Sequence, residues 1–200
     1  MGLGEGFFAA RVGTSLIGDA ALVIIDVQKG FDDPSWGERN NPAAEQNIEA
    51  ILGSWREANR PIFHIQHLST SPTSLLNSAN AGSEIKDGVK PLPSEPVITK
   101  SVNSAFIGTD LEQRLKASGH RRLVIVGLTT DHCVSTTTRM ASNLGFEVYL
   151  ISDATATFGR IGDDGKYYSA EAIHKINLVS LSGEFATVLE TAKLFELLSR

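Results

Sequence analysis

Hydrophobic residues follow two patterns along the chain, and the two patterns alternate. The first is a short apolar run, seen at 20–27, which is typical of a β-strand covered on both faces. Similar runs predict further strands over 61–67, 97–99, 123–127, 146–151 and 186–189. The second pattern is an apolar spacing of three and four residues, which predicts helices and is clearest at Ile48, Ile51, Leu52 and Trp55.

Several polar residues between these segments are typical of helix ends. Asn41 and Pro42 are placed to act as the N-cap and the first residue of the helix that follows them. Thr109 and Glu112 have the spacing of a capping box, which predicts a second helix that ends near Gly119. A helix that starts at or just before Cys133 is expected to end at 144–145.

The alternation of strands and helices predicts the fold class. Residues 68–95, which hold several Pro, Ser, Asn and Gly residues, are expected to form a long excursion that is functional or buried against a partner subunit. Later in the chain we expect a loop over 153–165 and a helix over 170–181. The pattern predicts one α/β domain over residues 1–200, a doubly wound three-layer α/β/α sandwich around a mainly parallel sheet of about six strands.

Composition narrows the class of protein. The 200 residues are 42% hydrophobic and carry a net charge of −5, so they favour one substantial core and disfavour a nucleic-acid surface. A single cysteine excludes an internal disulfide and fits a reducing compartment. The chain has no apolar stretch that could span a bilayer, and its N-terminus lacks the features of a signal peptide. We therefore expect a cytoplasmic protein that binds neither nucleic acid nor membranes.

Three side chains with catalytic chemistry follow predicted strands. Asp26 ends the first apolar run, Lys100 follows the third, and Cys133 lies where the fourth run gives way to a helix. Taken singly, each has an ordinary role as a turn cap, a solvated charge or a small buried thiol. In doubly wound folds, however, ligands bind at the carboxyl ends of the strands. The three positions together therefore favour one shared site.

The three residue types suit nucleophilic attack on a carbonyl. A thiol near the start of a helix is expected to favour its thiolate form. Asp26 can accept the thiol proton and return it to a leaving amine, and Lys100 can hold both groups in their charged forms. The backbone N–H groups of Thr129 and Cys133 are candidates for an oxyanion hole. This chemistry predicts an acyl-enzyme that water then hydrolyses.

These residues also carry a family resemblance. The segments Asp-Val-Gln after the first strand, Lys-Ser-Val-Asn-Ser-Ala-Phe from Lys100, and Gly-Leu-Thr-Thr-Asp-His-Cys-Val through Cys133 resemble the isochorismatase-like cysteine hydrolase superfamily. The similarity spans nearly the whole chain. It implies that Asp26, Lys100 and Cys133 form a catalytic triad. It also implies a cis peptide bond before Thr129 and an assembly between a dimer and an octamer.

The resemblance bears on metal binding as well. Nicotinamidases of this superfamily bind a metal through an Asp-x-His motif, where this chain has His67 and Ser69. His64 and His67 are three residues apart in a predicted strand, so they are expected to point to opposite faces. We therefore expect no metal, no cofactor and no nicotinamidase activity.

Four further residues are candidates for the substrate pocket. Gln28 follows Asp26 and is placed to orient it or a substrate carbonyl. Phe31 and Trp36 are candidate pocket walls, although Trp36 suits the shaping of its own loop almost as well. His132 is expected at the rim of the pocket, because neighbouring residues on a tight turn point apart.

The expected function is hydrolysis of a C–N bond, other than a peptide bond, in a small amide, ureide or related substrate. Three alternatives remain open: vinyl-ether hydrolysis of the isochorismate type, a non-catalytic assembly or regulatory role, and thiol redox sensing. The resemblance also implies a homo-oligomer, for which Phe7, Phe8 and the 68–95 segment are candidate contacts.

Overall fold

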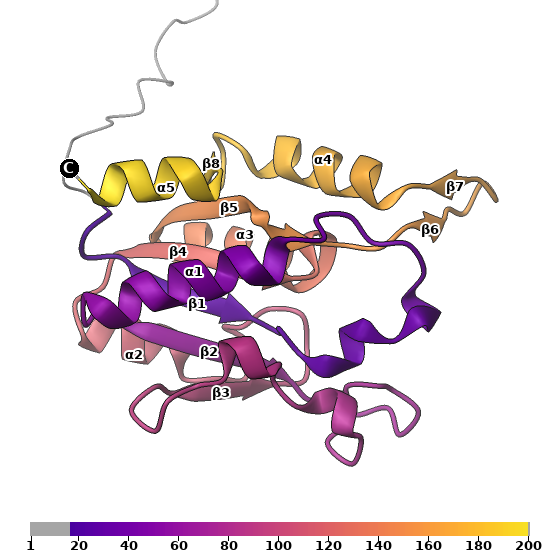
Figure 1. Ribbon diagram of the computed structural model, residues 1–200, viewed down its shortest axis with the longest axis horizontal. Helices are drawn as coiled ribbons and strands as arrows, with labels where there is room; N and C mark the ends of the chain where they lie inside the picture. The colour runs from indigo at the N-terminus through magenta and orange to yellow at the C-terminus, as the bar shows by residue number, and fades with distance from the viewer. Residues whose placement is uncertain (1–16, 200) are drawn as a thin grey trace, which may run out of the picture.

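A central sheet of six strands organises residues 17–199, the part of the chain that the computed structural model describes (Figure 1). The strand order is β3-β2-β1-β4-β5-β8, and every neighbouring pair runs parallel. The strands are β1 (Ala21–Ile25), β2 (Ile62–His67), β3 (Val97–Lys100), β4 (Arg122–Leu128), β5 (Glu147–Ala156) and β8 (Thr187–Leu189). The predicted doubly wound α/β fold is confirmed.

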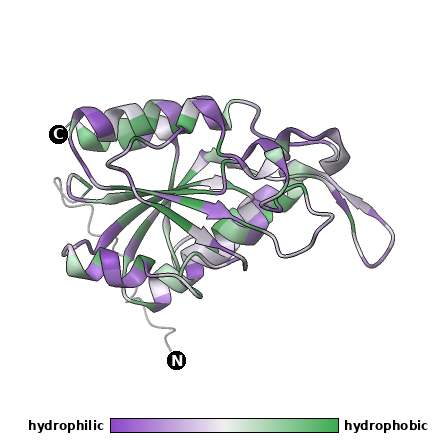
Figure 2. Cartoon of the chain, turned by 90° about the horizontal axis from the view of Figure 1, so that it is seen from below, coloured by the Kyte–Doolittle hydropathy of each residue, from purple (hydrophilic) through white to green (hydrophobic). Residues whose placement is uncertain are grey.

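Helices cover both faces of this sheet. One face carries α1 (Ala44–Glu57) and α5 (Thr191–Leu198), and the other carries α2 (Leu111–Ala117), α3 (Ser135–Asn143) and α4 (Ala170–Leu181). Figure 2 shows mostly green, hydrophobic strands in the middle of the molecule and helices of mixed green and purple residues on either side. Among the described residues, no helix has the length and apolar character needed to cross a membrane.

The sheet has a separate apolar core on each face. In β1, Val23 and Ile25 join the core under α2, α3 and α4, whereas Leu22 and Ile24 join the core under α1 and α5. Successive side chains of a strand point to opposite faces, so a strand buried on both sides must be apolar throughout. This requirement is why the continuous apolar run of β1 predicted a central strand.

The strand order reverses between β1 and β4. The sheet grows from β1 through β2 to β3 on one side, and from β4 through β5 to β8 on the other. At such a reversal the connections leave the carboxyl edge in opposite directions, and a crevice opens between them. Asp26 directly follows β1, and residues 129–134 directly follow β4, so both border this crevice.

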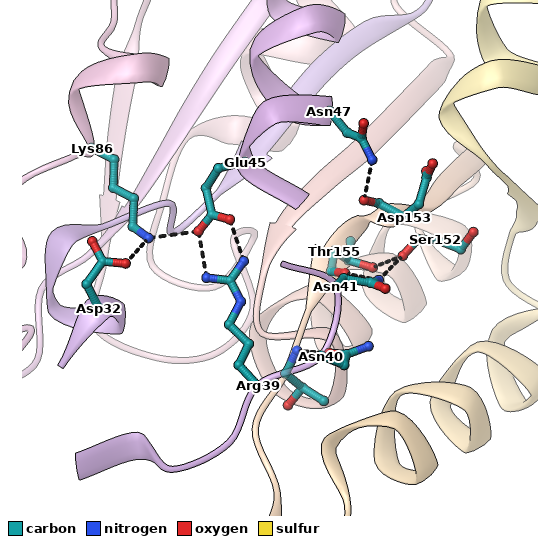
Figure 3. A network of polar contacts seen from close by, with 11 residues as sticks. Asp32, Arg39, Asn40, Asn41, Glu45, Asn47, Lys86, Ser152, Asp153 and Thr155 are labelled. Carbon is teal, nitrogen blue, oxygen red and sulfur yellow. Dashed lines mark hydrogen bonds and ion pairs between the residues drawn. The ribbon is translucent and has the colours of Figure 1, made fainter. Parts of the chain in front are cut away.

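The start of α1 differs from the prediction. The helix begins at Ala44, and its N-cap is Ala43 instead of Asn41. Asn41 has a φ of 44°, and its side-chain amide donates to the carbonyls of Ser152 and Thr155 at 2.9 and 2.7 Å (Figure 3). The prediction was wrong because this amide joins the segment before α1 to the distant strand β5.

The capping box predicted for α2 does not form. The N-cap residue is Asp110, whose carboxylate pairs with Arg114 at 2.7 Å. Thr109 lies one residue earlier and accepts a hydrogen bond from the N–H of Leu111 at 3.4 Å. The carboxylate of Glu112 forms an ion pair one turn further along the helix instead. The spacing was therefore correct for a helix start, but the bonds expected of it were wrong.

The segment 153–165 is not the loop that its composition predicts. Strand β5 continues to its end at Ala156, and β6 (Arg160–Ile161) pairs with β7 (Tyr167–Tyr168) as an antiparallel hairpin. Several polar residues of β5 bond partners that are distant in the chain. Asp153 Oδ1, for example, accepts hydrogen bonds from the N–H and the hydroxyl of Thr191, both at 2.8 Å. A strand stabilised in this way lacks the apolar pattern on which the prediction relied.

The long 68–95 excursion is anchored to the domain by charges. It contains two short 3-10 helices, Ala81–Ser83 and Asp87–Val89. Between them, Lys86 Nζ bonds the carboxylates of Asp32 at 2.5 Å and Glu45 at 2.7 Å (Figure 3). Arg39 pairs with the same Glu45, with one contact at 2.7 Å. The network holds the excursion against α1 and against the segment that follows β1.

Gly127 in β4 should not tolerate a side chain. Its φ is +121°, and an added Cβ would lie 2.0 Å from the Ile25 carbonyl oxygen of β1. We expect Gly127→Ala to lower the free energy of unfolding by about 3 kcal/mol or more, because no rotamer relieves a clash with backbone. Urea unfolding measures this change.

Gly53→Ala in α1 is the matched control. An added Cβ at Gly53 meets no heavy atom of the described residues within 4 Å. Because alanine is the better helix former, we expect this variant to gain about 0.5–1 kcal/mol. Equal unfolding free energies for the two variants would contradict the proposed close approach of β1 and β4.

The Glu45 network should make the fold sensitive to acid. Burial alone raises the pKa of Glu45, but its bonds with Arg39 and Lys86 outweigh burial and lower the pKa from 4.5 to about 2. A carboxyl whose pKa is depressed in the folded state contributes stability that is complete above about pH 4.5 and is lost as the pH falls to about 2. We expect Glu45→Gln to be less stable than the wild type at pH 7, and the difference to shrink across this window.

Unfolding free energies measured at several pH values test this expectation. The exposed Glu57 at the end of α1 supplies the control, since Glu57→Gln removes a carboxylate of the same helix that lies outside the network. A constant difference between Glu45→Gln and the wild type from pH 7 to pH 2.5 would show that the network does not stabilise the carboxylate.

Candidate active site

The carboxyl edge of the sheet brings Asp26, Lys100 and Cys133 together. Lys100 Nζ donates to Asp26 Oδ2 at 2.5 Å and to Cys133 Sγ at 3.2 Å. The side chains of Lys100 and Asp26 are both 0% exposed, and Cys133 is buried as well. The three residues predicted from separate strand ends therefore form one cluster shielded from water.

Asp26 leaves β1 in a left-handed conformation, with a φ of 50°. Its N–H donates to the Ile65 carbonyl of the neighbouring strand β2 at 3.0 Å, which fixes the backbone at this point. Oδ2 binds Lys100, whereas Oδ1 is buried and has no hydrogen-bond partner among residues 17–199. Burial raises the pKa of Asp26, and the charge of Lys100 opposes that rise. A buried carboxylate oxygen with a free lone pair is well suited to accept a proton.

Cys133 lies in a π-helical turn, Thr130–Val134, that leads into α3. Burial raises the pKa of its thiol to about 12; the carboxylate of Asp26 adds to the rise, and the ammonium of Lys100 opposes it. The thiol hydrogen bonds Asn103 Oδ1 at 3.8 Å. The expectation of a thiolate is therefore not met in the free site, because burial and the Asp26 carboxylate together outweigh the ammonium of Lys100. Attack by this sulfur requires a base.

The turn before Cys133 begins with a cis peptide bond between Leu128 and Thr129, as the resemblance implied. The carbonyl of Thr129 accepts hydrogen bonds from the N–H groups of His132 and Val134, both at 3.2 Å. These bonds close the turn around Cys133. An oxyanion hole formed by the N–H groups of Thr129 and Cys133 stays a prediction.

The two histidines of β2 contact different partners, as their spacing predicted. His64 is buried, and its Nε2 lies 2.8 Å from Glu95 Oε2. His67 ends the strand, and its Nδ1 lies 3.1 Å from Lys100 Nζ. The sequence had left open whether His67 or His132 faces the site. The rule that strand ends share one edge of the sheet was the signal that could have selected His67.

The donor atoms of Asp26, His67 and Cys133 lie within 4.8 Å of one another, which is close enough to hold a metal ion. However, Lys100 Nζ contacts all three residues, so its ammonium already places a cation among these donors. Ser69, at the position of the expected metal-binding histidine, instead accepts a hydrogen bond from the N–H of Ser71 at 3.2 Å. These residues therefore do not fit the metal site that the resemblance describes for nicotinamidases.

The side-chain amide of Gln28 forms hydrogen bonds with backbone groups. Its Nε2 donates to the carbonyls of His67 and Ser83 at 2.9 and 2.8 Å, and its Oε1 accepts the N–H of His67 at 2.9 Å. Gln28 is fully buried and joins the end of β1 to β2 and to the 68–95 excursion. Its suggested contact with substrate stays a prediction.

Phe31 and Trp36 form an aromatic cluster with Phe158. The ring centroids of Trp36 lie 5.2 Å from those of Phe31 and 5.5 Å from those of Phe158. Trp36 also donates its indole N–H to the carbonyl of Gly30 at 2.8 Å, so it shapes its own loop. The cluster packs with Leu128, which ends β4 just before the turn that contains Cys133. Its role as a pocket wall stays a prediction.

His132 neighbours Cys133 in the chain but points to a different group. Its side chain is 51% exposed, and its Nε2 lies 2.5 Å from a guanidinium nitrogen of Arg160. The same guanidinium pairs with Asp131 at 2.8 Å. Burial of the ring and the charge of Arg160 lower the pKa of His132, against the opposing charge of Asp131. His132 is thus placed outside the Asp26–Lys100–Cys133 cluster.

Comparison with known proteins agrees with this geometry. The family model described as Isochorismatase domain matches residues 20–193, which include all three clustered residues. The chain belongs to the isochorismatase family.

Several members of the family are similar over nearly their full length. YrdC of Bacillus subtilis, an isochorismatase family protein, is 56% identical over 174 residues, which cover 87% of this chain and 93% of the relative. A crystal structure of an isochorismatase-family protein from Chromobacterium violaceum has a TM-score of 0.88 at 42% identity, covering 91% of this chain and 94% of that one. Nicotinamidase 3 of Arabidopsis thaliana is 29% identical over 188 residues, which cover 88% of this chain and 86% of the relative.

Removing both charges of the Asp26–Lys100 pair should cost this isochorismatase-family chain less stability than the sum of the two single changes. Asp26→Asn or Lys100→Met alone leaves a buried charge without its partner, which typically costs about 3–5 kcal/mol. Asparagine is chosen because it tolerates the left-handed backbone of Asp26. We expect the double variant to recover about 2 kcal/mol or more relative to the sum of the single changes. Urea unfolding of the four proteins measures the coupling, and strictly additive changes would show that the two charges do not depend on each other.

Proposed function

We propose that this chain is a metal-independent cysteine hydrolase that cleaves a C–N bond in a small amide, ureide or related substrate. The observation that carries the proposal is the buried ammonium of Lys100, which donates one hydrogen bond to Asp26 and another to Cys133. One charged group thereby holds a carboxylate base and a sulfur nucleophile at the carboxyl edge of the sheet. Membership of the isochorismatase family supports a hydrolase.

The first half of the reaction forms an acyl-enzyme. Asp26 Oδ1 takes the thiol proton while Cys133 Sγ forms a bond to the substrate carbonyl carbon, and the carbonyl electron pair moves to oxygen. When the pair returns, the C–N bond breaks, and the leaving nitrogen takes the proton from Asp26. The products are a thioester on Cys133 and a free amine or ammonia.

The second half restores the enzyme. Asp26 accepts a proton from water as the water oxygen attacks the thioester carbonyl. The C–S bond then breaks, the acid product leaves, and Asp26 returns the proton to Cys133 Sγ. Each half thus uses the same carboxylate first as base and then as acid.

Lys100 offsets the effect of burial on the Cys133 thiol. A thiol with a pKa of about 12 is almost entirely protonated at neutral pH, so proton removal must accompany attack. The ammonium, 3.2 Å from Sγ, stabilises the negative charge that develops on sulfur as the proton leaves. It does so without reorganisation, because it is already held in place by Asp26.

The comparison supports an amide as the substrate class. One relative over 88% of the chain is named a nicotinamidase, and nicotinamide is a primary amide. The donors around Lys100 differ from the metal site described for such enzymes, so we propose an amide or ureide other than nicotinamide.

A homo-oligomer in the cytoplasm that binds a small-molecule substrate remains the expected setting for this activity. The contacts suggested for Phe7 and Phe8 lie outside the described residues. Contacts through the 68–95 segment stay a prediction.

Ammonia release from a panel of primary amides and ureides tests the proposal. We expect at least one substrate to be turned over, and Cys133→Ala to reduce the rate by about a thousandfold or more, because it removes the nucleophile. Mass spectrometry of the wild type mixed with that substrate should find the acyl group on the peptide that contains Cys133. Asp26→Asn should accumulate no more than a trace of this adduct, because the base for attack is lost.

Ser135→Ala is the control, since this buried hydroxyl lies two residues beyond the nucleophile and outside the proposed chemistry. Turnover that survives Cys133→Ala would reject the covalent mechanism. Silence of the wild type and Cys133→Ala across the whole panel would favour the non-catalytic role.

A further inference from the structure

The Lys100 ammonium has a third partner that the proposed reaction does not use. An ammonium group has three N–H donors and no acceptor. Two of them bond Asp26 Oδ2 and Cys133 Sγ, at 2.5 and 3.2 Å. The third bonds His67 Nδ1 at 3.1 Å. Every donor of this buried cation is therefore matched by one acceptor.

The fold places His67 at this position from two directions. His67 ends β2 and is paired in register with Lys100 at the end of β3, so the two side chains leave the sheet together. The side-chain amide of Gln28 forms two hydrogen bonds with the backbone of His67, one with the His67 N–H and one with the His67 carbonyl, each at 2.9 Å. The ring has a further hydrogen bond with the backbone of Val102. The imidazole is thus held against the ammonium.

The contact with Lys100 determines the protonation of the ring. Lysine can only donate, so Nδ1 must be the nitrogen without a hydrogen, and the ring proton lies on Nε2. Burial and the charge of Lys100 lower the pKa of His67 to about 4, so the ring is neutral at physiological pH. Protonation would place two positive groups 3.1 Å apart.

We propose that His67 is a positioning residue, whose neutral imidazole holds the Lys100 ammonium between Asp26 and Cys133. The inference rests on the proposed function and deepens it. Without this acceptor, one N–H of a fully buried ammonium loses its partner, and the ammonium is free to rotate away from Cys133. Cys133 then loses the stabilisation of its thiolate.

The charged and titratable groups that face the ring come from three other elements: Lys100 of β3, Asp26 after β1 and Cys133 in the turn after β4. A change at His67 should therefore be transmitted to the thiol through Lys100. Because Cys133 is the single cysteine of the chain, alkylation by iodoacetamide reports on this thiol alone.

Two variants distinguish the loss of the hydrogen-bond acceptor of His67 from a change in the volume of its side chain. His67→Phe fills a similar volume and has no acceptor. His67→Asn places its Oδ1 the same number of bonds from the backbone as Nδ1 and restores an acceptor. We expect His67→Phe to slow alkylation about tenfold or more between pH 7 and pH 9, and His67→Asn to stay within about threefold of the wild type. His120→Phe, at a histidine outside the cluster, should match the wild type.

Alkylation needs no substrate, so this test is independent of the proposed function. With a substrate in hand, His67→Phe should lower kcat and leave KM within about twofold, and His67→Asn should restore kcat. Alkylation of His67→Phe at the wild-type rate would overturn the proposal, as would equal slowing in His67→Asn when both variants melt as folded proteins. If His67→Phe fails to fold, His67→Leu makes the same comparison with a smaller side chain.

Discussion

The buried ion pair between Lys100 and Asp26 is the interaction on which the rest of this site depends. Both side chains are fully shielded from water, where an unpaired charge is strongly destabilising. The pair is stable in this position because each N–H of the Lys100 ammonium has an acceptor: Asp26, His67 or Cys133. Three features of the fold position these groups. They are the strand order, the left-handed backbone at Asp26, and the hydrogen bonds that Gln28 forms with the backbone of His67 at the end of β2.

The surroundings of Cys133 also determine the state of its thiol. Burial keeps Cys133 protonated, and the ammonium lowers the energy of its thiolate only as the thiolate forms. In the proposed mechanism, this thiol reacts only when Asp26 takes its proton. The ammonium of Lys100 also lies among Asp26, His67 and Cys133, the three side chains whose donor atoms are close enough to hold a metal ion. The proposed metal independence therefore agrees with the presence of a histidine at position 67, where the metal-binding motif has an aspartate.

The sequence was most informative where a local pattern and the fold impose the same requirement. Strands buried on both faces must be apolar, so β1 and β4 were recognised, and α4 has the bounds that its spacing predicted. Prediction was wrong where a polar side chain bonds a distant strand, as Asn41 does with β5. The later part of β5 was missed for the same reason, since its polar residues are satisfied by partners far away in the chain.

By itself, the sequence determined the fold class and the three residues of the proposed triad, because each of these residues lies at or soon after the carboxyl end of a predicted strand, and those ends must lie at one edge of the sheet. Only the tertiary structure decided how their charges interact. The raised pKa of Cys133, the unpaired oxygen of Asp26 and the selection of His67 over His132 depend on burial and on distances between residues far apart in the chain. Electrostatic energies in a protein interior vary steeply with both quantities, and neither is encoded by local spacing.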